Sequence, residues 1–154
     1  MIELKRILVA TDFSDHASVA LRYAGEFAKA FQAEMILCHV VENPDMLSQI
    51  PPGGEGYFPP NLTELQEQSA RTTCEKLLAE SGIDNGRVII PHGSPFAEIV
   101  KTARGEEVDL IVIGTHGRGV VAHVLLGSVA ERVVRKAPCP VLTVREGEHE
   151  FVKP

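Results

Sequence analysis

The sequence predicts an α/β protein with a five-stranded parallel sheet and helices on both faces. Two observations lead to this fold class. Short apolar runs typical of strands alternate with helical patterns along the chain and end in a fifth run. Each run is apolar throughout, as expected when helices cover both faces of a sheet. The 154 residues suffice for one domain, which we expect to span residues 1–146 with a polar tail at 147–154.

The amino-terminal part predicts strand, helix and strand. Residues 7–10 form the first apolar run, and apolar side chains then recur at helical spacing as far as Phe31. Ser14 or Asp15 is the expected N-cap of this helix. Residues 35–41 indicate the second strand.

Residues 43–60 differ in character, because five prolines and three glycines prevent a helix or strand from continuing through them. We interpret this segment as a long loop, which is either a mobile excursion or a lid over a ligand. A helical pattern follows over residues 62–81 and ends at Gly82.

The carboxyl-terminal part predicts three more strands and two more helices. Residues 88–90 indicate the third strand, and Ser94 followed by Pro95 is a typical helix start. The fourth strand is expected at 108–113 and the fifth at 141–144. The helix between them should bury a face made by Val129, Ala130, Val133, Val134 and Ala137.

Four glycines and a serine gather where the fourth strand passes into the last helix: Gly114, Gly117, Gly119, Gly127 and Ser128. Glycine allows the backbone to approach a ligand closely, and a helix start offers unpaired N–H groups at the positive end of a dipole. This grouping predicts a phosphate-binding loop and therefore nucleotide binding. The alternative is that the glycines serve only turns and packing.

Individual residues of this loop carry more specific expectations. The Gly-Lys-Ser/Thr ending of a Walker motif is absent, and Arg118 is the cation that either contacts phosphate or remains solvated. Ser128 and Glu131 have the spacing of a capping box, and the Ser128 hydroxyl can also donate to a phosphate oxygen. A valine at Gly127 is expected to occupy the space of the phosphates while leaving the fold intact.

Asp12, at the exit of the first strand, has two interpretations. It is either a turn residue that satisfies local N–H groups or an acceptor for a ribose hydroxyl or a base amine. If the first and fourth strands are neighbours, Asp12 and the glycine loop flank one crevice. His116 lies within the loop, whereas no histidine pair has a metal-ligand spacing and no nucleophile–base system is visible.

Composition argues against several partners. A net charge of −6 disfavours nucleic acid, and no apolar run approaches the ~20 residues that would cross a membrane. The amino terminus passes directly into a strand-like run without a signal-peptide core, which predicts a cytoplasmic protein. The three cysteines have no close spacing, so neither a disulfide framework nor a zinc site is expected.

From these residues the chain resembles the universal stress protein family, in particular its ATP-binding branch. The resemblance extends from Lys5 to Val144 and rests on residues 7–14, 39–41, 109–119, 126–130 and 139–142. The family pattern of Gly, two residues, Gly, nine residues, Gly and then Ser or Thr is met at every position, by Gly114, Gly117, Gly127 and Ser128.

The resemblance implies a Rossmann-like fold, of the adenine nucleotide alpha hydrolase-like kind, with strand order 3-2-1-4-5. It places adenine near Ala10 and Val40, ribose near Asp12 and Gly114, and the phosphates along the glycine loop. The ligand would be ATP, or ADP or AMP, with Mg²⁺ or Mn²⁺ held mainly by the phosphates. The implied binding residues are Ala10, Thr11, Asp12, Val40, Gly114, Thr115, Gly117, Arg118, Gly127, Ser128 and Val129.

The resemblance also implies a homodimer formed by the fifth strand, residues 141–144, whose apolar edge would otherwise be open. The sequence therefore predicts a cytoplasmic, ATP-binding sensor or regulator of the stress response, without catalytic residues and with slow ATP hydrolysis at most. Two alternatives remain open: a nucleotide-free dimerisation module, and an ATPase.

Overall fold

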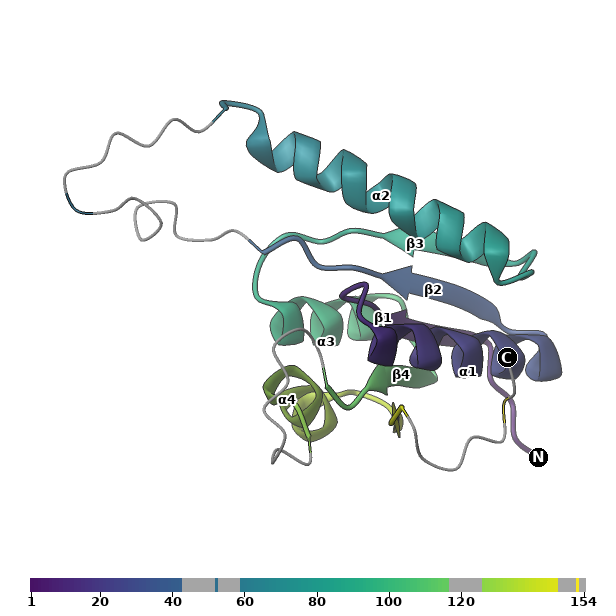
Figure 1. The fold of residues 1–154 in the computed structure, drawn as a ribbon. Helices are drawn as coiled ribbons and strands as arrows, with labels where there is room; N and C mark the ends of the chain where they lie inside the picture. The colour runs from purple at the N-terminus through teal and green to yellow at the C-terminus, as the bar shows by residue number, and fades with distance from the viewer. Residues whose placement is uncertain (43–51, 53–58, 117–125, 147–151, 153–154) are drawn as a thin grey trace.

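A computed structural model describes residues 1–42, 52, 59–116, 126–146 and 152 (Figure 1). In chain order the elements are β1 (Arg6–Ala10), α1 (Asp15–Phe31), β2 (Glu34–Cys38), α2 (Leu62–Glu80), β3 (Gly86–Ile89), α3 (Pro95–Gly105), β4 (Leu110–Gly114), α4 (Ser128–Lys136) and β5 (Val141–Val144). The Pro/Gly-rich loop predicted at 43–60 lies outside the described residues except at positions 52, 59 and 60, and most of the predicted tail does too.

The five strands form one parallel sheet in the order β3-β2-β1-β4-β5, which confirms the predicted fold class and strand order. β1 lies at the centre, with Val9 paired to Leu37 of β2 on one side and to Val112 of β4 on the other. The chain builds outward from β1 in one direction through β2 and β3, and in the other through β4 and β5. The strand order therefore reverses between β1 and β4.

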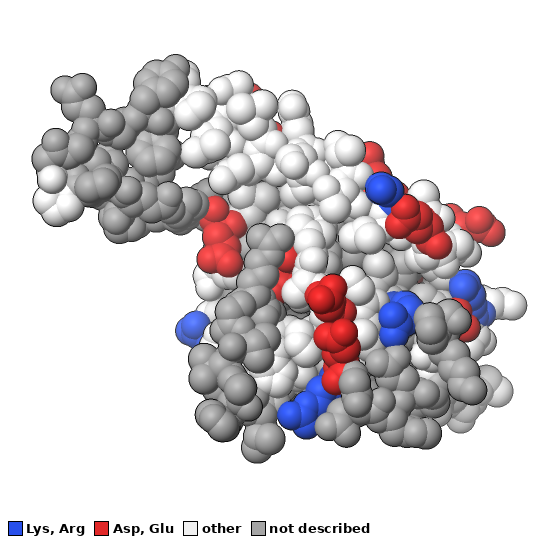
Figure 2. All heavy atoms as spheres, viewed as in Figure 1, with Lys and Arg blue, Asp and Glu red and all other residues white. Residues whose placement is uncertain are grey.

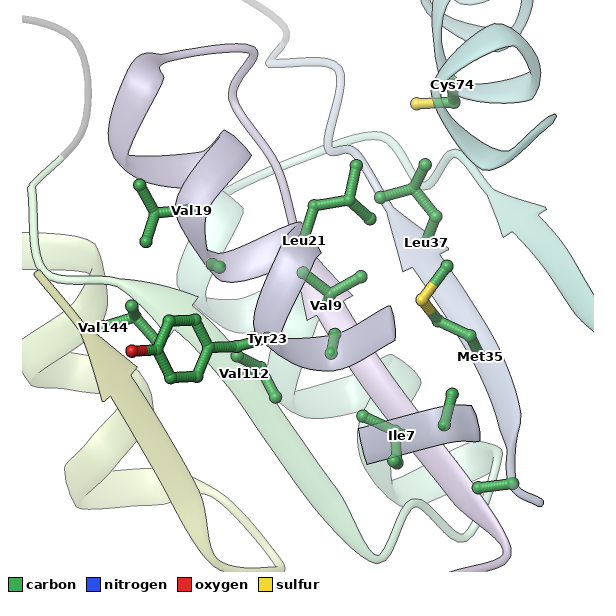
Figure 3. Close-up of a cluster of buried hydrophobic side chains, with 14 of the residues drawn as sticks. Ile7, Val9, Val19, Leu21, Tyr23, Met35, Leu37, Cys74, Val112 and Val144 are labelled. Atoms are coloured by element: carbon green, nitrogen blue, oxygen red, sulfur yellow. The ribbon is translucent and has the colours of Figure 1, made fainter. Parts of the chain in front are cut away.

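Alternation along β1 divides the interior into two apolar layers. Ile7 and Val9 face α1 and α2, where Tyr23 and Cys74 join the same cluster (Figure 3). Leu8, on the opposite side of the strand, contributes to the second cluster beneath α3 and α4. Each fully buried aliphatic side chain of this kind contributes roughly 1.5–3 kcal/mol to folding. Helices therefore cover both faces, as the continuous apolar strands predicted.

The strand limits differ from the sequence expectation. β2 ends at Cys38 rather than at 41, because beyond it Val41 makes only an isolated bridge with His92. β3 begins at Gly86, before its apolar run, because its pairing with β2 starts there, opposite Met35. β4 begins at Leu110 rather than at 108.

The helix starts are mostly as predicted. Ser14 is the N-cap of α1, and its Oγ accepts a hydrogen bond of 3.3 Å from the Ala17 N–H. Ser94 and Pro95 begin α3.

No helix among the described residues combines the length and the apolar composition that crossing a bilayer requires. On the face drawn in Figure 2, basic and acidic side chains are scattered rather than gathered into one basic patch.

The three cysteines are free thiols in different environments. Burial raises the pKa of Cys38 to about 12 and that of Cys74 to about 11, so both remain protonated at physiological pH. Cys139 is only partly buried, and burial raises the pKa of its thiol as well.

We therefore expect a thiol reagent at about pH 8 to label one cysteine of the native protein slowly and all three after denaturation. The measurement is a count of thiols that react with Ellman's reagent over time. The Cys139→Ser variant should lose the native reaction. Rapid reaction of the native Cys139→Ser protein would contradict the burial of the other two thiols.

Candidate functional site

The exits of β1, β2 and β4 converge at one edge of the sheet (Figure 1). Ala10 ends β1 and Gly114 ends β4, and the strand order reverses between these two strands. Ligands of open α/β sheets bind at such a reversal, outside the carboxyl ends of the strands. The sequence predicted a single crevice on the condition that the first and fourth strands are neighbours. β1 and β4 are paired, so this condition is met.

The turn after β1 is held by short local hydrogen bonds. Thr11 is buried and donates its N–H to the Cys38 carbonyl at 2.9 Å, which ties this turn to β2. The Oδ1 atom of Asp12 accepts from the Ser14 N–H at 3.0 Å. Asp12 thus performs the turn role that the sequence left open. Its carboxylate has two oxygens and about four acceptor positions, so this role does not exclude a ligand contact.

Phe13 and His39 form a stacked pair beside this turn. Their ring centroids are 4.3 Å apart, and the His39 Nδ1 lies 2.8 Å from the Thr11 carbonyl oxygen. Because a carbonyl only accepts, Nδ1 must carry the proton. Phe13 has a φ of 64°, a left-handed conformation that costs a non-glycine residue roughly 1–2 kcal/mol. The sequence carried no signal of this pair, since neither the positive φ nor the stacking follows from a local pattern.

A groove of about 560 Å³ lies next to the stacked pair, on the side of α2. Phe13, His39 and Val40 line one wall, and Leu65 and Ala70 of α2 line another. Val40 is the residue that this groove shares with the predicted binding set. The wall from α2 could not be foreseen, because nothing local indicates which strand end that helix covers.

Thr115 ties the glycine loop to the sheet. Its N–H donates to the Val144 carbonyl at 2.9 Å, and its own carbonyl accepts from the Gly127 N–H at 2.5 Å. The chain therefore leaves the sheet at Thr115 and returns to the same residue at Gly127. Thr115 is 7% exposed, so these main-chain bonds lie in a buried setting.

Both described glycines of the motif have packing roles. A Cβ on Gly114 would lie 2.9 Å from the carbonyl carbon and oxygen of His16, and a Cβ on Gly127 would lie 2.9 Å from the Thr115 carbonyl oxygen. Close approach of backbone to backbone thus requires glycine at both positions. The expectation that a valine at Gly127 leaves the fold intact is wrong, because that side chain would meet main chain before any ligand.

The start of α4 differs from the predicted capping box. Gly127 is the N-cap, and Ser128 is the first helical residue, without a side-chain capping bond. Glu131 pairs instead with Arg135, at 2.8 Å. Ser128 is exposed and makes no capping bond, so its hydroxyl lies at the N-terminal end of α4, which we call the mouth of α4. The N–H groups of the first turn point out of this mouth, at the positive end of the dipole.

The predicted apolar face of α4 is only partly correct. Ala130 and Val133 are buried, and Val129 packs against the cluster beneath α3 and α4. Val134 is 47% exposed, because it lies about 100° around the helix from Val133 and so turns away from the sheet. Val129 can therefore offer its main chain, rather than its side chain, to a ligand.

Some of the predicted set remains without a structural test. Gly117, Gly119 and Arg118 lie outside the described residues. The structure brings together the remaining members at one edge: Ala10, Thr11, Asp12, Val40, Gly114, Thr115, Gly127, Ser128 and Val129. Among the described residues, no three His, Cys, Asp or Glu side chains are placed to hold a metal ion.

Known proteins are similar in sequence to this chain over most of its length. A model of the universal stress protein family matches residues 3–145. The Thermus aquaticus protein named "Universal stress protein in QAH/OAS sulfhydrylase 3'region" is 39% identical over 142 residues, which are 92% of this chain and 98% of that protein. Universal stress protein MJ0577 of Methanocaldococcus jannaschii is 33% identical over 155 residues, covering 92% of this chain and 94% of that one.

Solved structures are similar over the same extent. The structure of MJ0577 matches with a TM-score of 0.80 and 34% identity, covering 96% of this chain and 100% of that chain. A universal stress protein solved in complex with cAMP matches with a TM-score of 0.67 and 25% identity, covering 94% of this chain and 98% of that one. These proteins share the fold described above, and the second of them holds an adenine nucleotide.

Proposed function

This chain belongs to the universal stress protein family, and on that premise we propose that it is a cytoplasmic ATP-binding regulator of the stress response. The observation that carries the proposal is that the predicted binding residues lie together at one edge of the sheet. Asp12, Thr115 and the mouth of α4 meet at the reversal of the strand order, in a chain whose glycines and Ser128 have the family's ATP-binding spacing. Arrangements of this kind bind nucleotides in α/β proteins.

Each part of the nucleotide has a proposed place. Adenine lies between Ala10 and Val40, and the ribose hydroxyls donate to Asp12 near Gly114. The phosphates accept from the main-chain N–H groups of the first turn of α4 and from the Ser128 hydroxyl. Gly117 and Arg118 complete this cradle, while Thr11 and Thr115 hold its two sides. Mg²⁺ or Mn²⁺ is bound mainly by the phosphate oxygens.

Adenine as the base is supported by the cAMP complex of the 25% identical relative. A triphosphate is supported by the family's ATP-binding spacing, which Gly114, Gly117, Gly127 and Ser128 meet. ADP and AMP would fill the same adenine and ribose positions with fewer contacts at α4. We therefore expect affinity to increase from AMP to ADP to ATP.

The proposed site predicts that the protein hydrolyses ATP slowly at most. The loop lacks a Walker lysine to neutralise the terminal phosphate, and the sequence shows no evident general base beside the loop. The protein would therefore act through the nucleotide-bound state rather than through turnover. A multiple-turnover assay with MgATP tests this: turnover of about 1 s⁻¹ or faster, typical of dedicated enzymes, would favour an ATPase instead.

The direct test of ATP binding uses freshly purified protein. We expect denaturation to release adenine nucleotide, identified by chromatography, in an amount approaching one per chain. We also expect saturating MgATP at ~100 times its Kd to stabilise the nucleotide-free protein by about 2.7 kcal/mol, measured by thermal unfolding.

A nucleotide-free interaction module is the second candidate, and the packing of Gly114 and Gly127 favours it, since packing alone explains both glycines. Under that hypothesis no nucleotide is released and MgATP leaves the melting temperature unchanged. The two measurements together therefore decide between the candidates.

The proposed assembly is a homodimer through β5, an edge strand of the sheet in which two of the three apolar residues, Val141 and Leu142, are only half-buried. We expect sedimentation to give twice the chain mass of 16.7 kDa. A lysine on an edge strand opposes pairing of strands between chains, so Thr143→Lys, at an exposed position of β5, should shift the protein towards monomer. Thr72→Lys, at an exposed position of α2, is the matched control. Equal dimerisation of both variants would place the interface elsewhere.

A further inference from the structure

The turn that carries Asp12 is held on both sides of that residue. Thr11, before it, donates its N–H to the Cys38 carbonyl at 2.9 Å, and the Thr11 carbonyl oxygen lies 2.8 Å from the Nδ1 of His39. Phe13, after it, donates its N–H to the Thr11 Oγ1 at 3.1 Å and stacks on the ring of His39. His39 therefore contacts both the residue before Asp12 and the residue after it.

Phe13 adopts a backbone conformation that needs support from its surroundings. Its φ of 64° lies in the left-handed region, which a bulky side chain disfavours. Such conformations persist where neighbouring groups stabilise them, and they cluster at ligand-binding sites. Phe13 is supported by the ring of His39, at a centroid distance of 4.3 Å, and by the apolar cluster on the side of α1 and α2.

A change at Phe13 would be transmitted to Asp12. The core fixes both β1 and α1, so the short turn between them must absorb any change of φ at Phe13. The carboxylate of Asp12 is part of this turn, because its Oδ1 accepts from the Ser14 N–H at 3.0 Å and Ser14 caps α1. With Oδ1 held in this way, the direction of the second carboxylate oxygen is set by the turn, and that oxygen has acceptor positions for a ligand.

We propose that Phe13 and His39 are positioning residues that hold Asp12 as an acceptor for a sugar hydroxyl, so that the site selects ribonucleotides over their deoxy analogues. This inference rests on the ATP site proposed above and gives that site a substrate class. An analogue without the hydroxyl leaves a fixed carboxylate without its hydrogen bond, and the analogue then binds weakly. A carboxylate that is not held turns to water instead and discriminates little.

The experiment is calorimetric titration of the full chain with the magnesium complexes of ATP, 2′-deoxy-ATP and 3′-deoxy-ATP, since each analogue lacks one sugar hydroxyl. For the wild type we expect at least one analogue to bind about 10–100-fold more weakly than ATP, the loss that accompanies one hydrogen bond to a charged group. Asp12→Asn keeps an oxygen for the Ser14 N–H and replaces the other oxygen with an amide donor. It should reduce this ratio to about threefold or less.

Two variants test the pair itself. His39→Phe keeps a ring for stacking and removes the N–H donor to Thr11, whereas Phe13→Leu keeps an apolar side chain and removes the stacking. Each should reduce the ratio by about fivefold or more and change the affinity for the weaker analogue by less than about twofold. In an Asp12→Asn background neither should reduce the ratio further, because the acceptor that they position is gone.

His92→Phe is the matched control. It makes the same substitution after β3, at a histidine whose Nε2 lies 2.9 Å from the Oε2 of Glu67 in α2, and it should leave the ratio as in the wild type. Circular dichroism and thermal unfolding verify that each variant is folded. An equal loss of affinity for ATP and for both analogues in His39→Phe, or an unchanged ratio, overturns the positioning role.

The outcomes distinguish this inference from the proposed function. Wild-type protein that binds MgATP and both deoxy analogues equally well overturns the sugar selection and leaves the ATP site in place. Failure of MgATP to bind at all overturns both.

Discussion

Replacing Ser128 with glutamate is expected to reduce the affinity for MgATP by about 100-fold and to leave the fold unchanged. Ser128 is exposed at the first position of α4 and makes no capping bond, so the substitution breaks no interaction that holds the helix. A carboxylate in the first turn is favourable to a helix by about 0.3–1 kcal/mol. The same carboxylate faces the phosphates, where repulsion at ~5 Å and an effective dielectric constant of ~20 amounts to about 3 kcal/mol.

The matched control at this position is Ser128→Gln, which has the size of glutamate without its charge. It removes the hydroxyl donor, and we expect a loss of affinity of about tenfold from one missing hydrogen bond. Affinity is measured by calorimetric titration and stability by thermal unfolding. If the glutamate and glutamine variants bind MgATP equally well, the mouth of α4 does not hold the phosphates.

Replacing Gly114 with valine should destabilise the protein by about 2–4 kcal/mol, a large part of the 5–15 kcal/mol that folding of a domain provides. The Cβ would lie 2.9 Å from the carbonyl group of His16, and both neighbours are main chain. Neither can rotate aside as a side chain does, so α1 would have to move relative to β4. In a domain of 154 residues this corresponds to a fall in melting temperature of roughly 5–15 °C.

Gly105→Ala is the control for this prediction. Nothing lies within 4 Å of a Cβ at Gly105, the last residue of α3, and its φ is not in the left-handed region. Alanine there should be neutral or stabilise the protein by up to about 1 kcal/mol, since it lowers the entropy of the unfolded chain. Equal melting temperatures for Gly114→Val and Gly105→Ala would show that α1 and β4 are not in close contact.

The Gly114 prediction also determines how other glycine variants must be interpreted. A Cβ at Gly127 would lie 2.9 Å from the Thr115 carbonyl oxygen. Loss of nucleotide binding in a Gly127 variant would therefore follow either from disturbed packing or from a blocked phosphate site, and binding data do not separate the two. Ser128 carries no such packing constraint. The serine is therefore the informative position for the ligand, and the glycines are informative for the fold.

Much of the fold was predictable because its signals are local. The apolar runs that became β1 and β5, and the helical spacing from Ala20 to Phe31, each lie within a short window of sequence. Of the two predicted caps, Ser14 and Asp15, the structure has Ser14, and this signal is local as well. The strand limits were less accurate, because β2 ends where its pairing with its neighbours ends and not where its apolar residues end.

The sequence proposes which residues make up the candidate site, and that membership stays a prediction, but it does not predict how they are arranged. Spacing identified Gly127 and Ser128, yet it assigned the cap to Ser128, whereas Gly127 occupies that position. The reason is that the Gly127 N–H is already committed to Thr115, which fixes its extended conformation just before the helix. A local rule for helix starts does not include a partner that is twelve residues away.

By itself, the sequence determined the order of elements, the parallel sheet with helices on both faces, and the glycine–serine spacing that marks this family. These features depend on periodicity and on turn residues, which operate within a few positions of the chain. Only the tertiary structure decided that α1 lies against Gly114, that Phe13 stacks on His39, and that His16 meets His116. Such contacts join residues far apart in sequence, and they arise from the packing of whole layers, which no local pattern encodes.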